Sequence, residues 1–281
     1  MSEQTVDKFI AEIISELKQN RLKLPTLPEV ATRVQKTLEN DNATASLVAK
    51  AVGSDVALSA RLIQVANSPL YRGSKKIESV QMAVARLGLK VCRSLVMSLV
   101  MQQLFQTKSE VLRSRMKKLW EHSMEVAAIS RILAQKFTRL DPELAMLGGL
   151  IHDIGAIPII THADNYPVLA NSPGLLDDAI ERLHTNLGKL ILETWQFSPE
   201  LIPVAAEHEK LDRQADGADY ADVVLVANLH SYIGEAEHRH GGIDLSAVPA
   251  FERLGLTTEA SIAAMQEAEA EIAETKRLIG G

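Results

Sequence analysis

Several features that would assign a chain to a particular class are scarce in this sequence. It has one cysteine in 281 residues, so no disulfide can form within the chain. Cys92 stands in the apolar run Val91–Val96, where a small buried side chain is expected rather than a reactive thiol. Aromatic residues are only 4% of the chain, but hydrophobic residues are 46%. Aliphatic side chains therefore suffice for a sizeable core, which argues against disorder.

Excess positive charge and long apolar runs are also missing. The formal net charge is −6, which argues against general nucleic-acid binding because such binders show an excess of Lys and Arg. No apolar run reaches about 18 residues without a charge, as a membrane-spanning helix requires. The segment Met1–Thr5 is polar and lacks the layout of a signal peptide. We therefore expect a cytoplasmic protein that does not bind membranes.

The pattern that is present is helical. Apolar residues recur at three- and four-residue spacing, and no strand-like alternation appears, which predicts an all-α fold. Prolines in Leu24–Pro28 exclude helix there, and Thr257 is a candidate cap for a last helix. The other predicted helices span 6–20, 29–39, 43–52, 57–67, 80–87, 89–105, 110–137, 142–152, 157–169, 174–195, 199–210 and 220–237.

The helix lengths suggest three parts. Short helices give way to one long helix near residue 108, so residues 1–108 are predicted to form an N-terminal helical bundle. Residues 109–240 are predicted to form the helical core, and residues 241–281 a C-terminal loop and helix. The last helix has a narrow apolar stripe, which is expected to pack on the body rather than in a coiled coil: Ile262, Met265, Ala268 and Ile272.

The candidate site begins with the doublet His152-Asp153, which lies in the apolar run Gly148–Gly155. A carboxylate removed from water must be paired, hydrogen-bonded or bound to metal. The doublet therefore supplies two metal ligands or forms a buried hydrogen-bonded pair. Gly148 and Gly149 precede the two polar residues by four positions and are expected to leave room beside them.

Other polar side chains share helix faces with apolar residues, so they should point inward as well. His122 lies in register with Leu119 and Val126, and His184 with Ile180 and Leu187. By the same test, the inward residues that form the candidate ligand set are His122, His152, Asp153, His184, His208 and Asn228.

Imidazole and carboxylate ligands suit a divalent transition metal, namely iron, manganese, zinc or nickel, and do not suit calcium. One bridging Asp153 could hold two ions, the arrangement that clamps a phosphate during hydrolysis. The alternative is a metal-free core in which these polar groups satisfy one another. The remaining histidines are expected at the surface or around the ligands: His162, His230, His238 and His240.

These residues resemble the HD superfamily of metal-dependent phosphohydrolases, and more closely its HDOD branch, a bacterial signalling domain related to the HD-GYP phosphodiesterases. The resemblance covers about residues 22–232. It implies an N-terminal helical bundle packed on a five-helix HD-like core that carries the site. The motifs that carry it are Leu24–Pro28, Asp55 with Leu58, Ala66–Ser68, Ala83 with Leu87-Gly88, Trp120–Ser123, Gly149–Gly155 and His184–Gly188 through Trp195 and Pro199 to His208.

This chain differs from the HD-GYP and HD hydrolase patterns at three positions that matter for function. Ala156 stands where HD-GYP proteins have lysine, Glu209 follows His208 where they pair histidines, and Asn228 replaces the final aspartate of HD hydrolases. Asp222 lies six residues before Asn228 and therefore faces elsewhere on the helix. HDOD domains resemble regulatory relatives that have lost catalytic residues.

Two functions follow from the resemblance. The first is a signalling scaffold that binds a protein partner and keeps a retained or vestigial metal site. The alternative is a metal-dependent phosphohydrolase acting on a nucleotide or cyclic dinucleotide, with Asp153 as the catalytic residue that orients the metals.

Overall fold

The computed structural model describes residues 2–38, 43–233 and 243–280. Within these ranges every regular element is a helix, which confirms the all-α class. In chain order the elements are α1 (Ser2–Lys18), α2 (Glu29–Leu38), α3 (Ala45–Gly53), α4 (Val56–Ala66), α5 (Val80–Met101), η1 (Gln102–Phe105), α6 (Glu110–Phe137), α7 (Pro142–Ile151), α8 (Ala156–Ala163), α9 (Pro167–Ala170), α10 (Pro173–Thr194), α11 (Ile202–Glu207), α12 (Tyr220–Ser231), η2 (Leu245–Ala247), α13 (Pro249–Arg253), α14 (Thr258–Glu267) and α15 (Glu269–Gly280).

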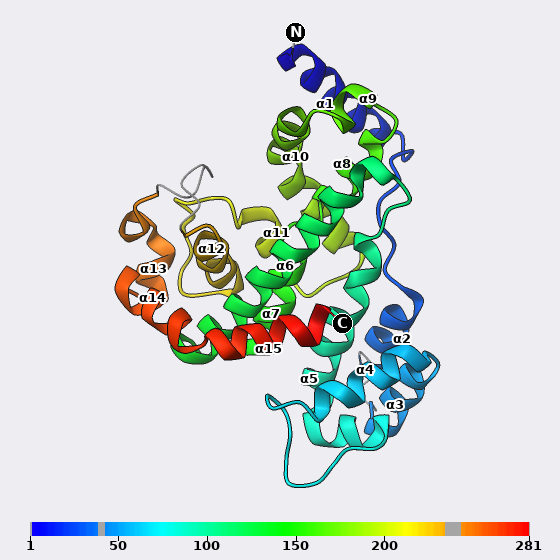
Figure 1. Cartoon of the computed structure of the whole chain (residues 1–281), viewed down its shortest axis with the longest axis vertical. Helices are drawn as coiled ribbons and strands as arrows, with labels where there is room; N and C mark the ends of the chain where they lie inside the picture. The colour runs from blue at the N-terminus through cyan, green and yellow to red at the C-terminus, as the bar shows by residue number, and fades with distance from the viewer. Residues whose placement is uncertain (1, 39–42, 234–242, 281) are drawn as a thin grey trace.

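Helices α2 to α5 form the predicted N-terminal bundle (Figure 1), in which α2, α3 and α4 all pack on α5. Side-chain caps start three of these helices. Thr44, Asp55 and Ser79 each accept the backbone N–H three residues further on, which satisfies donors that a helix leaves unpaired at its first turn.

Helix α5 is bent at Gly88, where the sequence predicts a break between two helices. Gly88 has φ 78° and ψ 164°, a conformation outside the helical region that residues with a side chain rarely adopt. The chain beyond it continues as a helix to Met101 and then as the short η1. The glycine therefore sets the direction in which the second half of α5 approaches the core.

The core is arranged around α6, whose bounds agree with the predicted helix 110–137. Helices α7, α12 and α15 pack along it. The stretch Pro142–Ala163 is long and apolar enough to cross a membrane, but 83% of its most apolar part is buried inside the fold. The hydropathy of this stretch is thus accounted for by its place in the core.

Helix α1 packs on α10 rather than on the α2–α5 bundle, and Figure 1 shows the two groups at opposite ends of the molecule. Its apolar stripe of Val6, Phe9 and Ile13 is buried, and the ring of Phe9 meets that of Tyr166 edge-on at 5.1 Å. The division of the chain at residue 108 stays a prediction, but its first helix lies spatially with the second part.

The C-terminal helix links α6 of the core to the N-terminal bundle. Helix α15 lies across α6 and reaches the bundle (Figure 1), where Arg61 of α4 donates to the carbonyl oxygens of Leu278 and Ile279. Gln102 donates to the carbonyl of Gly280 at 2.7 Å. The final segment forms two helices instead of one, and Ala268, between them, is buried against the body.

Some helices differ from the predicted ranges. The range 157–169 is two helices, because Pro167 cannot supply the N–H that a continuous helix needs. The range 199–210 contains only α11, which ends at Glu207 and leaves His208 as its C-cap. The predicted helix 220–237 is shorter: α12 ends at Ser231 with Tyr232 as its C-cap, and residue 237 lies outside the described residues.

Candidate metal centre

Five of the six predicted ligands meet in the core. His122 comes from the middle of α6, His152 caps the C-terminus of α7, and Asp153 lies in the turn between α7 and α8. His184 projects from α10, and His208 caps α11. Four helices and one turn, spread over more than eighty positions of the sequence, thus contribute to one cluster.

The carboxylate of Asp153 lies at the centre of this cluster. Its Oδ2 is 3.4 Å from Nε2 of His152 and 3.7 Å from Nε2 of His122. Its Oδ1 is 3.2 Å from Nε2 of His208 and 3.4 Å from Nε2 of His184. Each carboxylate oxygen therefore faces a different pair of imidazoles, and each set of three could hold one metal ion.

Backbone carbonyls fix the orientation of three of the rings. Nδ1 of His152 lies 2.7 Å from the carbonyl oxygen of Gly149, Nδ1 of His184 lies 2.8 Å from that of Ile180, and Nδ1 of His208 lies 2.9 Å from that of Val204. A carbonyl only accepts, so each Nδ1 carries the proton and, in a neutral ring, Nε2 presents a lone pair.

The lone pairs of His184 and His208 converge, and among the described residues no donor lies between them. Nε2 of His184 lies 3.2 Å from Nε2 of His208, and Nε2 of His152 lies 3.1 Å from Nε2 of His122. Two acceptors beside a carboxylate repel one another unless a cation or an added proton lies between them. The donor set therefore fits divalent transition metals, which bind neutral imidazole and carboxylate directly.

The protonation states of Asp153 and His122 fit a metal site. Burial alone would raise the pKa of Asp153, but positive charge on the rings of His152, His208 and His184 outweighs burial and holds that pKa well below its usual range, as a bound cation would. Burial, together with the neighbouring ring of His152, lowers the pKa of His122 to about 3. At neutral pH the carboxylate is ionised and the His122 ring is neutral, which are the forms that bind metal.

Glycines bring the helices close enough to form the cluster. A Cβ at Gly155 would lie 1.9 Å from the carbonyl oxygen of His184 and 2.5 Å from the backbone N of Gly188. A Cβ at Gly149 would lie 2.7 Å from Cα of Ala127 on α6. The expectation that Gly148 and Gly149 leave room beside the doublet is wrong for Gly149: the space is filled by the α6 backbone and Ser130.

Asn228, the sixth predicted ligand, lies next to the cluster on α12. Its side-chain nitrogen donates to Oε1 of Glu209 at 3.5 Å, and its buried Oδ1 has no hydrogen-bond partner among the described residues. The prediction that Asn228 binds metal therefore stays a prediction. Asp222 faces elsewhere as expected: it is fully buried in contact with Arg213 and Arg253.

Two residues beside the cluster were not in the predicted ligand set. Oε1 of Glu209 lies 3.8 Å from Nε2 of His208, and the hydroxyl of Tyr232 lies 3.3 Å from Nε2 of His122. The Tyr232 ring stacks on that of His122, with centroids 5.1 Å apart. The spacing of Tyr232 four residues after Asn228 was a usable signal, and so was the position of Glu209 directly after His208.

The other histidines differ in their surroundings. His230, expected at the surface or around the ligands, is instead 8% exposed with its ring 6.1 Å from that of Phe251. Burial lowers the pKa of His230 to about 4. His162 packs between the rings of Phe9 and Tyr166. His238 and His240 lie outside the described residues.

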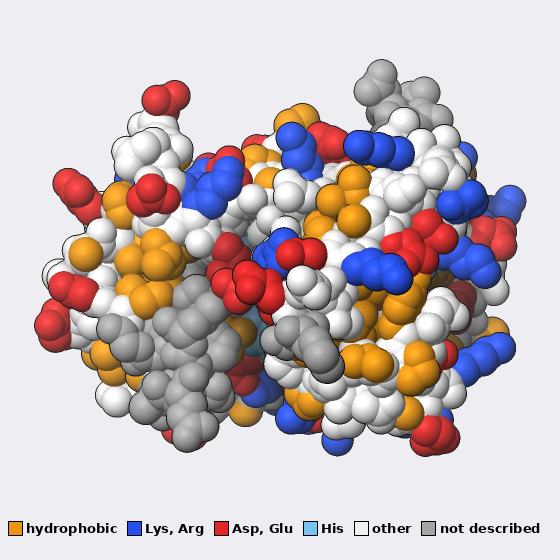
Figure 2. Space-filling model, turned by 90° about the horizontal axis from the view of Figure 1, so that it is seen from above, with side chains coloured by type: hydrophobic (Ala, Val, Ile, Leu, Met, Phe, Trp, Pro, Cys, Tyr) orange, Lys and Arg blue, Asp and Glu red, His pale blue; other side chains and the backbone are white. Residues whose placement is uncertain are grey.

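The cluster is open to solvent on one side. The side chains of His122 and Asp153 are each 17% exposed and that of Glu209 is 21% exposed, whereas those of His152 and His208 are fully buried. Figure 2 shows a small area of histidine surface in a hollow beside acidic side chains. A small molecule could therefore approach the Asp153 carboxylate from this side.

The chain belongs to the HDOD family, whose family model matches residues 24–211. It is similar to the crystal structure of a candidate metal-dependent phosphohydrolase from Shewanella amazonensis SB2B, with 29% identity, 98% of each chain covered and a TM-score of 0.83. An HDOD domain protein of unknown function from Geobacter sulfurreducens shares the fold, with 20% identity, 98% of each chain covered and a TM-score of 0.67.

A candidate signal transduction protein from Marinobacter aquaeolei VT8 also shares the fold, with 19% identity, a TM-score of 0.69, and all of this chain but 67% of that one covered. A curated uncharacterized protein of Treponema pallidum is 24% identical over 202 residues. That match covers 67% of this chain, which spans only 38% of the relative's length.

Proposed function

We propose that this chain is a metal-dependent phosphohydrolase of the HDOD family with a centre of two divalent transition-metal ions. One observation carries the proposal: the two oxygens of Asp153 face separate pairs of histidine nitrogens. This is the donor arrangement expected of a carboxylate that bridges two ions. The Shewanella amazonensis relative, named as a candidate for the same activity, supports the assignment.

Different residues of the chain would bind the two ions, accept a proton and position a ligand ring. His122 and His152 would hold one ion with Oδ2 of Asp153, and His184 and His208 the other with Oδ1. When bound, such ions activate water and neutralise charge on a phosphate. Glu209, partly exposed beside His208, would accept a proton from the attacking water. The hydroxyl of Tyr232 would hold the ring of His122 in place.

The substrate would be a phosphate ester, in the form of a nucleotide or cyclic dinucleotide. Two divalent ions bring more positive charge than the carboxylates of Asp153 and Glu209 neutralise, so the centre would attract an anion. Iron, manganese, zinc and nickel all suit this ligand set. The reaction would belong to signalling in the cytoplasm of a bacterium.

A second candidate is the scaffold that binds a signalling partner, with the metal in a structural role. Ala156 favours it, because this fully buried residue stands where HD-GYP relatives have a lysine that could meet substrate phosphate. A partner bound by the scaffold should still be recovered by the chain carrying both His152→Ala and Asp153→Ala.

The experiment compares hydrolysis of p-nitrophenyl phosphate, bis-p-nitrophenyl phosphate and a cyclic dinucleotide by the full chain loaded with iron or manganese. Activity should fall by about a hundredfold or more in Asp153→Ala and stay unchanged in His162→Gln, which alters a histidine away from the centre. A folded, metal-loaded chain that hydrolyses none of them would contradict the phosphohydrolase and leave the scaffold.

A further inference from the structure

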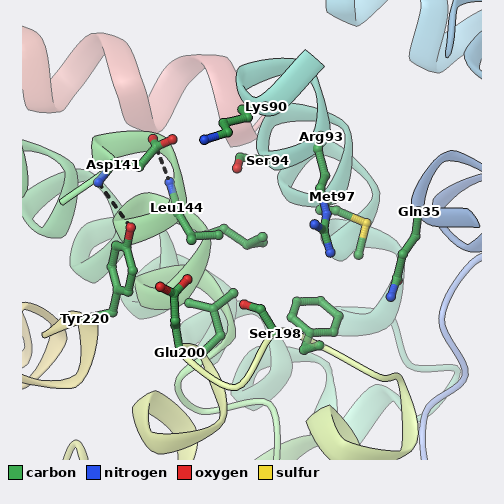
Figure 3. Close-up of a pocket in the computed structure, with 13 residues that line it drawn as sticks. Gln35, Lys90, Arg93, Ser94, Met97, Asp141, Leu144, Ser198, Glu200 and Tyr220 are labelled. Atoms are coloured by element: carbon green, nitrogen blue, oxygen red, sulfur yellow. Dashed lines mark hydrogen bonds between the residues drawn. The ribbon is translucent and has the colours of Figure 1, made fainter. Parts of the chain in front are cut away.

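A second candidate site lies between the α2–α5 bundle and the core. It is a cavity of about 300 Å³, a size at the lower end of pockets that bind small molecules. None of the five donor residues of the metal centre lines it. Its walls come from α2, α5, the start of α7, the segment between α10 and α11, and the start of α12 (Figure 3).

One wall of this cavity carries two cationic side chains, and the acidic residue Asp141 also lines the cavity. Lys90, Arg93 and Ser94 line it from the part of α5 that follows the bend at Gly88. Within the described part of the chain, neither Lys90 nor Arg93 has an ion-pair or hydrogen-bond partner. Arg93 is half-buried and Lys90 is exposed.

The opposite wall presents acceptors and a hydroxyl. Ser198 and Glu200 line it from the segment between α10 and α11 (Figure 3). Beside them, the hydroxyl of Tyr220 accepts the N–H of Asp141 at 3.1 Å, so its own hydrogen remains available to a ligand. Burial raises the pKa of Tyr220, which keeps that hydrogen in place.

Between the two polar walls the lining is apolar. Met97 of α5, Leu144 and Leu147 of α7, and Phe197 and Leu201 of the connecting segment border the cavity. Four of these five are buried residues of the hydrophobic core. A ligand body enclosed by them would lose apolar surface to the protein, which favours a flat or aliphatic group.

We infer that this cavity binds a small molecule with an oxyanion at one end, an apolar or aromatic body, and a hydrogen-bond donor at the other end. Arg93 and Lys90 would bind the oxyanion, because a guanidinium suits carboxylate and phosphate equally. Glu200 and Ser198 would accept from the donor. Such a ligand would join the bundle to the core, and its binding does not depend on the metal centre.

The test is a calorimetric titration of the full chain, kept metal-free with a chelator. The probes are adenosine monophosphate, whose oxyanion is a phosphate, and para-hydroxyphenylpropionate, whose oxyanion is a carboxylate. Inorganic phosphate is the third probe, since it lacks the apolar body. One of the first two should bind once per chain and more tightly than inorganic phosphate, and the one that binds identifies the oxyanion.

The variants are Arg93→Met combined with Lys90→Met, the charge-keeping Arg93→Lys, and Lys118→Met as a control on an exposed lysine of α6. The double variant should weaken binding by about tenfold or more, while Lys118→Met should not change it. If circular dichroism shows that the double variant is misfolded, Arg93→Lys provides the test instead. It must still weaken binding, because lysine cannot make the bidentate contact of a guanidinium with the oxyanion. The inference is overturned by absence of binding of both organic probes to the native chain, or by equal binding of inorganic phosphate.

Discussion

At the scale of single residues, the centre depends on where each imidazole nitrogen points. Spacing on a helix predicted that the histidines face inward, because residues three or four apart share a face. Spacing could not predict the division into two pairs, which depends on how α6, α7, α10 and α11 meet in space. The contacts of Glu209 with His208 and of Tyr232 with His122 were not predicted either, although both residues lie at positions that place them near predicted ligands.

The division into pairs leads to a prediction for single ligands. His122→Ala removes a ligand facing Oδ2 of Asp153, and His184→Ala removes one facing Oδ1. Each variant should therefore lose one of two bound ions and keep the other, since the second set of three ligands is intact. Elemental analysis of the dialysed proteins measures this. Loss of both ions in each folded variant would show that the pairs do not bind independently.

His230 predicts a pH dependence of stability. Its folded pKa of about 4 lies below the ordinary value of 6.5, so the unfolded chain binds the proton more readily. The neutral ring of His230 contributes about 3 kcal/mol to the free energy of unfolding. This contribution is complete above pH 6.5 and is lost as the pH falls towards 4. The free energy of unfolding, measured with urea in chelator, should fall less steeply over this range in His230→Leu than in His162→Gln. Parallel curves for the two variants would contradict the assignment.

At the scale of elements, the sequence predicted long helices better than short ones. The helix 110–137 has an uninterrupted apolar stripe over many turns, and α6 has those bounds. The start of α11 carries a local signal, because Pro203 lies in its first turn, whereas no capping side chain marks its end at Glu207. The end of α11 at Glu207 matters for the site. It places His208 at the C-cap, where its ring can turn towards Asp153.

Two glycines should respond differently to substitution by alanine. In Gly155→Ala the new Cβ would overlap the backbone of α10, so α10 must move and carry His184 with it. The cost should exceed about 3 kcal/mol, and metal binding should be lost. In Gly88→Ala the Cβ meets nothing within 4 Å, and only the strained backbone costs about 1 to 3 kcal/mol.

Urea unfolding and metal content of both variants measure this difference. Gly88→Ala should keep its metal, because its strain lies at the bend of α5 and not at the centre. Full metal content in Gly155→Ala would show that the approach of α10 to the turn after Asp153 is not required.

At the scale of the whole molecule, α15 adds a second link between the bundle and the core, which also pack directly through α5 and α7. It contacts the bundle through Arg61 and Gln102 and the core through the ion pair of Arg131 with Glu271. The sequence predicted that the last helix packs on the body. It could not show which parts it joins, because these contacts link residues more than a hundred positions apart.

Removing the link to the bundle should therefore destabilise the fold. Arg61→Ala loses donors to the last turn of α15 and should lower the free energy of unfolding by about 1 to 2 kcal/mol. The control Arg277→Ala removes an exposed ion pair with Glu274 and should change it by less than about 0.5 kcal/mol. Thermal and urea unfolding compare the two. Equal effects would mean that the contacts of Arg61 do not hold the bundle in place.

The most direct test of the whole account is the metal content of the purified chain beside that of Asp153→Ala, His152→Ala and His162→Gln. We expect about two divalent transition-metal ions per native chain and per His162→Gln chain. Asp153→Ala should retain little or none, since its carboxylate faces all four histidines, and His152→Ala should lose at least one ion. A folded native chain that binds no iron, manganese, zinc or nickel when these are supplied would contradict the metal centre and the phosphohydrolase together.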